Sequence, residues 1–198
     1  MIQNAEQALA LLKRSGVMTV VRAGPCPSLV VETLGESVRG SWWAHPRGRE
    51  VYAILAELDE HPDVLITRLI DGKNALVHRA LWPALLRLVT DDAWRKRATA
   101  SLDPEARALL RRVEKESRLR ADAMPTEMRR AKDSLARSLL VRVDQEHTPS
   151  GRHQLVLERW NAWASARQVA PADVSFDQAL AQLEGACGRE TLPFLTAR

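Results

Sequence analysis

Hydrophobic residues recur at helical spacing along most of this chain. Ala5, Ala8, Leu9 and Leu12 follow the i, i+3, i+4, i+7 spacing of one helix face. Similar stripes occur in later stretches, at Val51, Ile54, Leu55 and Leu58, at Ala106, Leu109, Leu110 and Val113, and at Met128, Ala131, Leu135 and Leu139. The pattern therefore predicts a mostly helical protein.

Helix-start signals precede several of these stripes. Pro46 suits the first position of a helix that we expect to end near residue 60. Asp103-Pro104-Glu105 combines a capping carboxylate, a first-position proline and an acidic residue that favours the helix dipole. Thr148-Pro149 also reads as a helix start, and Leu157, Trp160 and Ala164 continue at helical spacing. A last short helix is expected from Phe176 to about Leu183.

Shorter β-rich runs separate the helices. Residues 63–70 and 74–78 flank Asp71-Gly72, which is a strong signal for a β-hairpin. Residues 139–147 alternate like a strand. Two further segments stay open, because residues 17–21 fit a strand or a buried turn and residues 28–35 fit a helix or a strand. The expected fold class is α+β, predominantly helical, with winged-helix-like modules that contain a short β-hairpin.

The order of elements in residues 28–90 returns loosely in residues 103–167. In both stretches two helices are followed by a β element and a further helix. We expect a helical and hairpin module over residues 1–98 and a winged-helix-like module with a helical tail over residues 103–198. The linker between them is short, so the two modules should pack together.

Composition supports a folded protein without a membrane partner. The 198 residues are 45% hydrophobic and 27% charged, which is enough apolar content for a core. No run approaches eighteen apolar residues, and the segment around Glu6 lacks the basic opening of a secretory signal, so we expect a cytoplasmic location. Cys26 and Cys187 are the two cysteines, which excludes a disulfide framework and a CxxC motif.

The net charge of +4 is unevenly distributed. Residues 1–94 carry a net charge of −1 and residues 143–198 a net charge of −2, whereas residues 95–142 carry +7, from 14 Lys and Arg against 7 Asp and Glu. This basic segment indicates where an acidic partner such as DNA would bind.

Helices followed by a β-hairpin are typical of winged helix-turn-helix domains, in which a recognition helix enters the major groove. One candidate recognition helix is 46–60 with a wing at 64–78, but Glu57, Asp59 and Glu60 would oppose phosphate. The other is helix 125–138, with the strand at 139–147 in the wing, and charge favours it. Its candidate DNA contacts are Arg129, Arg130, Lys132 and Arg137. The alternative is an ordinary solvated helix whose charge is absorbed by interspersed acidic residues.

The segment 39–49 places two tryptophans among three arginines. Arg39, Arg47 and Arg49 form a second candidate DNA-binding patch. Trp42 and Trp43 are candidate aromatic contacts that stack on an unpaired base. The competing interpretation makes one or both of them core anchors that hold the loop.

Other chemistry finds little support in the sequence. His147 and His153 lack a third ligand at a familiar spacing, and the chain contains no HExxH, no phosphate-binding GxxxxGK[ST] loop, no GxGxxG and no GxSxG. We therefore predict no catalytic residue, no metal site and no cofactor.

Two strings carry a resemblance to known proteins. GSWWAHPRGREVYAIL with HPDVLITRLIDGKNALVHRALWPALL, and RSLLVRVDQEHTPSGRHQLVLERWNAWA, resemble an uncharacterised bacterial family of small winged-helix-like proteins. The second string is also similar to winged-helix domains of AlkZ-type DNA glycosylases. The Gln-x-Gln or Gln-x-Asp catalytic motif of those enzymes has no match, because Asp144-Gln145-Glu146 departs from it. The resemblance thus implies a fold more than an activity.

Three functions follow from these observations. The first is a non-catalytic DNA-binding protein that applies a basic helix and a wing to duplex DNA. The second is a nucleic-acid-processing enzyme related to DNA glycosylases. The third is a protein-interaction module or homodimer with a Trp-rich surface as its anchor.

Overall fold

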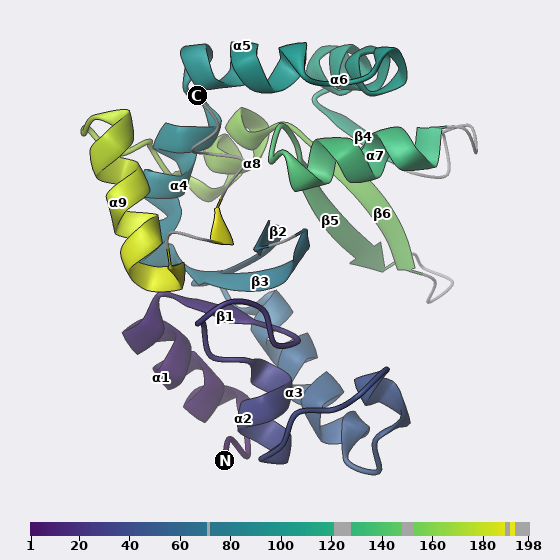
Figure 1. Ribbon diagram of the computed structural model, residues 1–198, viewed down its shortest axis with the longest axis vertical. Coiled ribbons are helices and arrows are strands. Elements are labelled where there is room, and N and C mark those ends of the chain that lie inside the picture. Colours follow the sequence, from purple (N-terminus) through teal and green to yellow (C-terminus); the bar gives the residue numbers. More distant parts are fainter. Residues whose placement is uncertain (71, 121–127, 148–152, 189–190, 193–198) are drawn as a thin grey trace. The chain divides into compact units, whose positions relative to one another are not determined.

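The computed structural model describes residues 1–70, 72–120, 128–147, 153–188 and 191–192. Its elements confirm an α+β protein that is mostly helical (Figure 1). In chain order they are α1 (Ala5–Ser15), β1 (Val17–Thr19), α2 (Leu29–Leu34), the 3-10 turn η1 (Trp42–Ala44), α3 (Gly48–Glu60), β2 (Val64–Ile70), β3 (Lys73–His78), η2 (Arg79–Leu81), α4 (Trp82–Val89), α5 (Asp92–Ala100), α6 (Pro104–Glu116), β4 (Arg118–Arg120), α7 (Met128–Arg137), β5 (Arg142–His147), β6 (His153–Glu158), α8 (Trp160–Arg167) and α9 (Phe176–Cys187).

The chain divides into two compact units. Unit 1 contains Met1–Trp82 and the segment that begins at Ala181, and unit 2 contains Pro83–Leu180. The division therefore lies earlier than the linker expected at 98–102. Hydrogen bonds explain why α4 and α5 belong to unit 2, because Arg87 of α4 donates to Val174 O and Arg95 of α5 donates to Leu140 O.

In unit 1 the predicted hairpin is present and is joined by a third strand. β2 and β3 pair antiparallel, and β1 pairs with the free edge of β3, which gives the order β1-β3-β2. Met18, Leu76 and Ile66 lie opposite one another in this register and share one face of the sheet. The two segments that the sequence left open are also assigned. Residues 17–19 form a strand, and residues 29–34 form a helix capped by Ser28.

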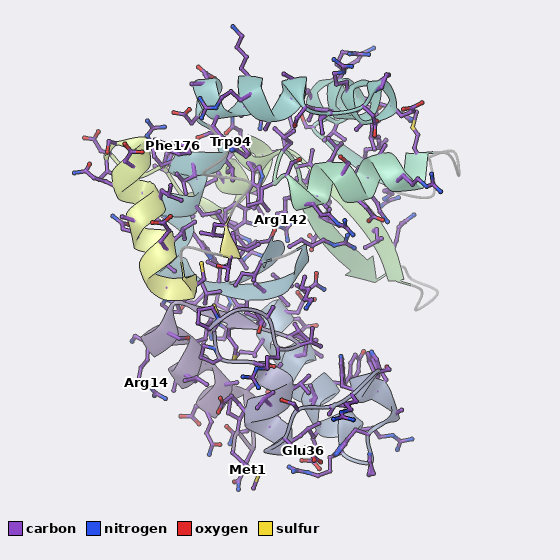
Figure 2. The ribbon with its side chains drawn as sticks, in the orientation of Figure 1. Met1, Arg14, Glu36, Trp94, Arg142 and Phe176 are labelled. Atoms are coloured by element: carbon purple, nitrogen blue, oxygen red, sulfur yellow. The ribbon has the colours of Figure 1, made fainter. Side chains whose placement is uncertain are left out.

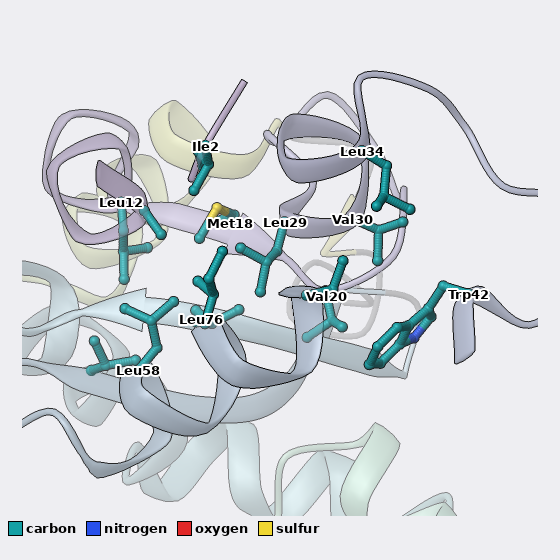
Figure 3. Close-up of a cluster of buried hydrophobic side chains, with 14 residues drawn as sticks. Ile2, Leu12, Met18, Val20, Leu29, Val30, Leu34, Trp42, Leu58 and Leu76 are labelled. Carbon is teal, nitrogen blue, oxygen red and sulfur yellow. The ribbon is translucent and has the colours of Figure 1, made fainter. Parts of the chain in front are cut away.

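The helices of unit 1 bury their apolar stripes against that face of the sheet. Figure 3 shows the cluster, to which α1 contributes Leu12, α2 contributes Leu29 and α3 contributes Leu58. The indole of Trp42 lies at one end of the cluster, beside Val20 (Figure 3). η1 is therefore anchored to the core by a large side chain.

Unit 2 contains a second three-stranded antiparallel sheet. β5 and β6 form a hairpin, and β4 pairs with the other edge of β6, which gives the order β4-β6-β5. The expected helix start at Thr148-Pro149 lies outside the described residues. The continuation of that helix through Leu157 is wrong, because residues 153–158 are strand β6 and α8 begins at Trp160. Pairing on both edges of β6 supplies the backbone hydrogen bonds that a helix would have supplied internally.

Two predicted helix ends also move. α3 begins at Gly48, with Arg47 at the N-cap, so Pro46 lies outside the helix. α9 continues through Gly185 to Cys187. Neither change alters which residues form the apolar stripe of the helix.

Both units follow one plan. In unit 1, α1 and β1 precede α2 and α3, and the hairpin β2–β3 follows; in unit 2, α6 and β4 precede α7, and the hairpin β5–β6 follows. In both sheets the first strand pairs with the third and the third with the second. This shared strand order starts at α1 and at α6 and differs from the repeat expected over residues 28–90 and 103–167, which included neither β1 nor β4.

Candidate functional site

The predicted basic helix, α7, is amphipathic. Ala131, Leu135 and Ala136 are buried, and α6 and α7 pack against each other. On the outer side, Arg130 and Arg137 are exposed. The buried stripe thus fixes the direction in which these two arginines point.

A shallow groove runs along the exposed side of α7. It has a volume of about 530 Å³ and is lined by Ser101 and Leu102 together with Arg130, Asp133, Ser134, Arg137 and Ser138. Arg130 and Arg137 are seven residues apart, so their positions on the helix are separated by about 10 Å. The groove therefore presents two guanidinium groups along one line.

The four basic residues predicted on α7 differ in what they offer a ligand. Within the described part of the chain, Arg130 and Arg137 have no ion-pair partner. Lys132 is largely buried, with 15% of its side chain exposed, and its Nζ lies 3.7 Å from Asp133 Oδ1. Arg129 is on α7, and its side chain lies outside the described residues.

Ion pairs absorb much of the other positive charge in the basic segment. Arg95 pairs with Glu114 at 3.0 Å, and Arg112 pairs with Glu116 at 2.9 Å. Arg142 Nη1 contacts Asp144 at 2.8 Å and Glu158 at 2.9 Å (Arg142 is labelled in Figure 2). Of the 14 basic residues of this segment, these three already have acidic partners, so the cations open to a partner are fewer than 14.

A second candidate surface, the aromatic platform, lies in unit 1 and consists of Trp42, Trp43 and Tyr52. Trp42 is buried at 9% exposure, whereas Trp43 is 60% exposed and Tyr52 is 40% exposed. The two indoles stack, with ring centroids 4.3 Å apart and an interplanar angle of 22°. Tyr52 of α3 lies 5.1 Å from Trp43, centroid to centroid, at 44°. Trp42 is thus the core anchor and Trp43 the outward ring.

Hydrogen bonds hold the backbone of this platform. His45 N donates to Trp42 O at 3.1 Å, and Gly48 N donates to His45 O at 2.8 Å. His45 Nδ1 accepts from Arg47 N at 3.1 Å. These bonds fix the turn that leads from the tryptophans into α3.

The three arginines predicted beside the platform also differ. Arg47 makes two hydrogen bonds to Glu50, of 2.9 and 2.8 Å, and this interaction raises the pKa of Arg47 and holds the pKa of Glu50 below its usual value. Arg39 and Arg49 are exposed and have no ion-pair partner among the described residues. Arg49 and Tyr52 are separated by three residues on α3, so they are neighbours on its surface.

Sequence reasoning missed Tyr52 of the platform and Gly48, which lies beside the tryptophan backbone. Tyr52 was not singled out, although it is the sole tyrosine of the chain and follows Arg49 at helical spacing. Gly48 falls inside the helix expected from Pro46, and no local sequence signal marks its contact with the tryptophan turn. It is buried, and a Cβ there would lie 2.7 Å from Trp42 O, so α3 can begin against the tryptophan backbone only with glycine.

Unit 2 has a second cavity, of about 270 Å³, which the sequence did not suggest. Its lining includes Arg95, Glu114, Arg159 and Trp160. Arg95 donates to Val89 O and Leu140 O, and Arg159 donates to Glu114 O. The guanidinium donors in this cavity are therefore already bonded to backbone carbonyls of unit 2.

Cys26 and Cys187 are both buried and free, and they meet within unit 1. Cys187 donates to Leu183 O at 3.0 Å. The hydrogen bond between the two thiols and the burial of Cys26 raise the pKa of Cys26. Cys26 is thus held as a thiol inside the core.

Comparisons with protein-family models, with curated proteins and with solved structures found no match to this chain. Among the described helices, none combines the length and the apolar content needed to cross a membrane. In the same part of the chain, no group of three or more His, Cys, Asp or Glu side chains is arranged to hold a metal ion.

Proposed function

We propose that this protein binds duplex DNA through unit 2, without catalysing a reaction. The observation that carries the proposal is the pair Arg130 and Arg137, two exposed guanidinium groups on one side of α7, with the hairpin β5–β6 following the helix. Guanidinium groups bind phosphate oxygens in a bidentate manner, and an amphipathic helix can place them along a groove of DNA.

The topology of both units supports this interpretation. Winged-helix domains begin with a helix and a strand, continue with further helix and end with a β-hairpin. The first strand pairs with the outer edge of the third. In such domains the helix before the hairpin reads the major groove and the hairpin contacts the backbone. In unit 2, α7 has the position of that helix and β5–β6 the position of the wing.

Charge favours unit 2 over unit 1 as the DNA-binding unit. Residues 1–82 and 181–192 of unit 1 carry 10 Lys and Arg against 11 Asp and Glu, a net charge of −1, and residues 83–180 of unit 2 carry 18 against 14, a net charge of +4. The C-terminal half of α3 also exposes Glu57, Asp59 and Glu60, which would repel phosphate. For these reasons we assign the duplex contact to α7.

The test is duplex binding by the double variant Arg130→Gln/Arg137→Gln at several salt concentrations. Each lost phosphate contact lowers the magnitude of the slope of log K against log salt by about 0.9, so the slope should fall by about 2. Affinity at low salt should fall about five- to hundredfold.

The matched control is Arg14→Gln/Arg167→Gln, which removes the same charge from exposed positions on α1 and α8. It should retain nearly the full affinity and slope. Equal losses in the two double variants would reduce the effect to net charge and overturn the assignment to α7. A wild-type chain that binds no duplex at low salt would overturn the function itself.

A further inference from the structure

The aromatic platform of unit 1 presents two large rings to solvent. Apart from Met1, Trp43 and Tyr52 are the exposed large hydrophobic residues of the described chain. Exposed aromatic rings of this size are unfavourable in water unless a ligand covers them. Duplex binding by α7 leaves these two rings unused, and their exposed faces can accept a flat ligand.

The platform is built to be rigid. Trp42 fixes one face of Trp43 by stacking at 4.3 Å, and Trp42 is itself anchored in the core of unit 1. The hydrogen-bonded turn from Trp42 to Gly48 and the tight start of α3 leave little freedom for the ring. A pre-ordered aromatic face loses little entropy when a flat ligand stacks on it.

The size of the surface decides between two kinds of partner. A fully covered Tyr or Trp side chain accounts for about 150–250 Å². Since Trp43 is 60% exposed and Tyr52 is 40% exposed, the rings offer on the order of 200 Å², against about 800 Å² per partner in a stable protein interface. One or two stacked bases match this area, whereas a protein interface would have to draw most of its area from other kinds of side chain, since Met1, Trp43 and Tyr52 are the exposed large hydrophobic residues of the described chain.

The surroundings of the platform suit a nucleotide. Arg49, three residues before Tyr52 on α3, and Arg39 are exposed cations without an ion-pair partner among the described residues. Ala53 and Ala56 are exposed and small, which leaves space beside Tyr52. Proteins that bind single-stranded nucleic acid usually stack a base on an aromatic ring and hold the phosphate with a nearby guanidinium group.

From these features we infer that Trp43 and Tyr52 form a stacking site for an unpaired base of single-stranded DNA, with Arg39 and Arg49 as contacts to its phosphates. The site is separate from α7 and relies on the proposed function only for the choice of DNA over RNA. Glu57, Asp59 and Glu60 at the far end of α3 confine the strand to the N-terminal end of that helix.

The test measures the fluorescence anisotropy of labelled (dT)12 with the full chain. It uses the Arg130→Gln/Arg137→Gln background, so that α7 does not contribute. Trp43→Ala should weaken binding roughly fivefold to more than a hundredfold, as expected for the loss of one base stack. Trp43→Phe, which keeps an aromatic face, should retain most of the affinity.

Other outcomes would overturn the inference. The first is a lack of binding to (dT)12. The second is equal binding by the wild type and Trp43→Ala, with circular dichroism showing that both are folded. The third is self-association that depends on Trp43, which would assign the platform to a protein interface. Tighter binding of (U)12 than of (dT)12 would overturn the assignment to DNA. Duplex binding by Trp43→Ala in the unmodified background should be unchanged, so a failure of the α7 proposal remains separate from a failure here.

Discussion

Gly48 is the residue that allows α3 to start directly against the tryptophan turn. A Cβ at this position would lie 2.7 Å from Trp42 O and 3.3 Å from Trp43 O. Both atoms are backbone, so neither can move aside without shifting the platform. Gly185, inside α9, is the opposite case, because a Cβ there would meet nothing within 4 Å.

Replacing each of these two glycines by alanine should change the free energy of unfolding in opposite directions. Gly48→Ala should destabilise the protein by about 1–3 kcal/mol, because overpacking outweighs the gain in helix propensity. Gly185→Ala should stabilise it by about 0.5–1 kcal/mol, since only the propensity changes. Urea unfolding of both variants measures the difference. The same sign for both would contradict the close approach at Gly48.

His78 makes stability depend on pH. It is buried at the end of β3, where its Nδ1 accepts from Ala80 N at 3.3 Å. Burial lowers the pKa of His78, and the charges of Lys13, Arg79 and His61 lower it further, against the opposing effect of Asp63. The folded protein therefore prefers the neutral imidazole.

Because the folded pKa lies below the unfolded one, the stabilisation is complete above the ordinary pKa of about 6.5 and is lost as pH falls towards the folded value. The slope due to this one proton cannot exceed about 1.4 kcal/mol per pH unit. His78→Asn should flatten the decline in unfolding free energy between pH 7 and pH 5. An unchanged pH profile in this variant would show that other groups cause the decline in unfolding free energy.

At the scale of elements, Arg142 ties the hairpin of unit 2 together. Its guanidinium, on β5, bonds Asp144 of the same strand and Glu158 of β6, and its Cζ lies 5.9 Å from the centroid of the Trp163 ring of α8. Glu158 retains only 13% exposure of its side chain. Removing the cation would leave that carboxylate nearly buried without its charge partner.

Arg142→Met should therefore destabilise the protein by about 3–5 kcal/mol. Arg142→Met/Glu158→Leu should recover part of that loss, since the uncompensated charge is then absent. Thermal or urea unfolding of the two variants gives the comparison. If the double variant were no more stable than the single one, the cost would lie in lost packing on Trp163 and not in the charge.

The elements of this protein were predictable to different degrees. α6 follows from its Asp103 cap and apolar stripe, and the hairpin of β2 and β3 follows from Asp71-Gly72, because these signals are local. β6 was not predictable, since Leu157 fits a helical stripe and a strand equally well. The choice depends on β4 and β5, and β4 starts about forty residues before Leu157.

At the scale of the molecule, the two units divide the charge and, in our proposals, the ligands. Unit 2, with a net charge of +4 over residues 83–180, takes the duplex, and unit 1, with a net charge of −1, takes an unpaired base on its aromatic platform. Hydrogen exchange of the full chain can separate the two. A duplex should slow exchange in α7 and β5, and (dT)12 should slow it in residues 41–52. Protection by the duplex confined to unit 1 would contradict this division.

The sequence by itself determined the apolar stripes of the helices, the first hairpin, the α+β class and the position of the basic segment, because each depends on residues close together in the chain. The tertiary structure decided which charges stay open: Arg95, Arg112 and Arg142 are paired, while Arg130 and Arg137 have no ion-pair partner among the residues that the structure describes. It also decided that Trp42 is buried and Trp43 exposed. Two adjacent, identical residues have the same local signal, and only the packing of the unit 1 core around Trp42 distinguishes the anchor from the open face.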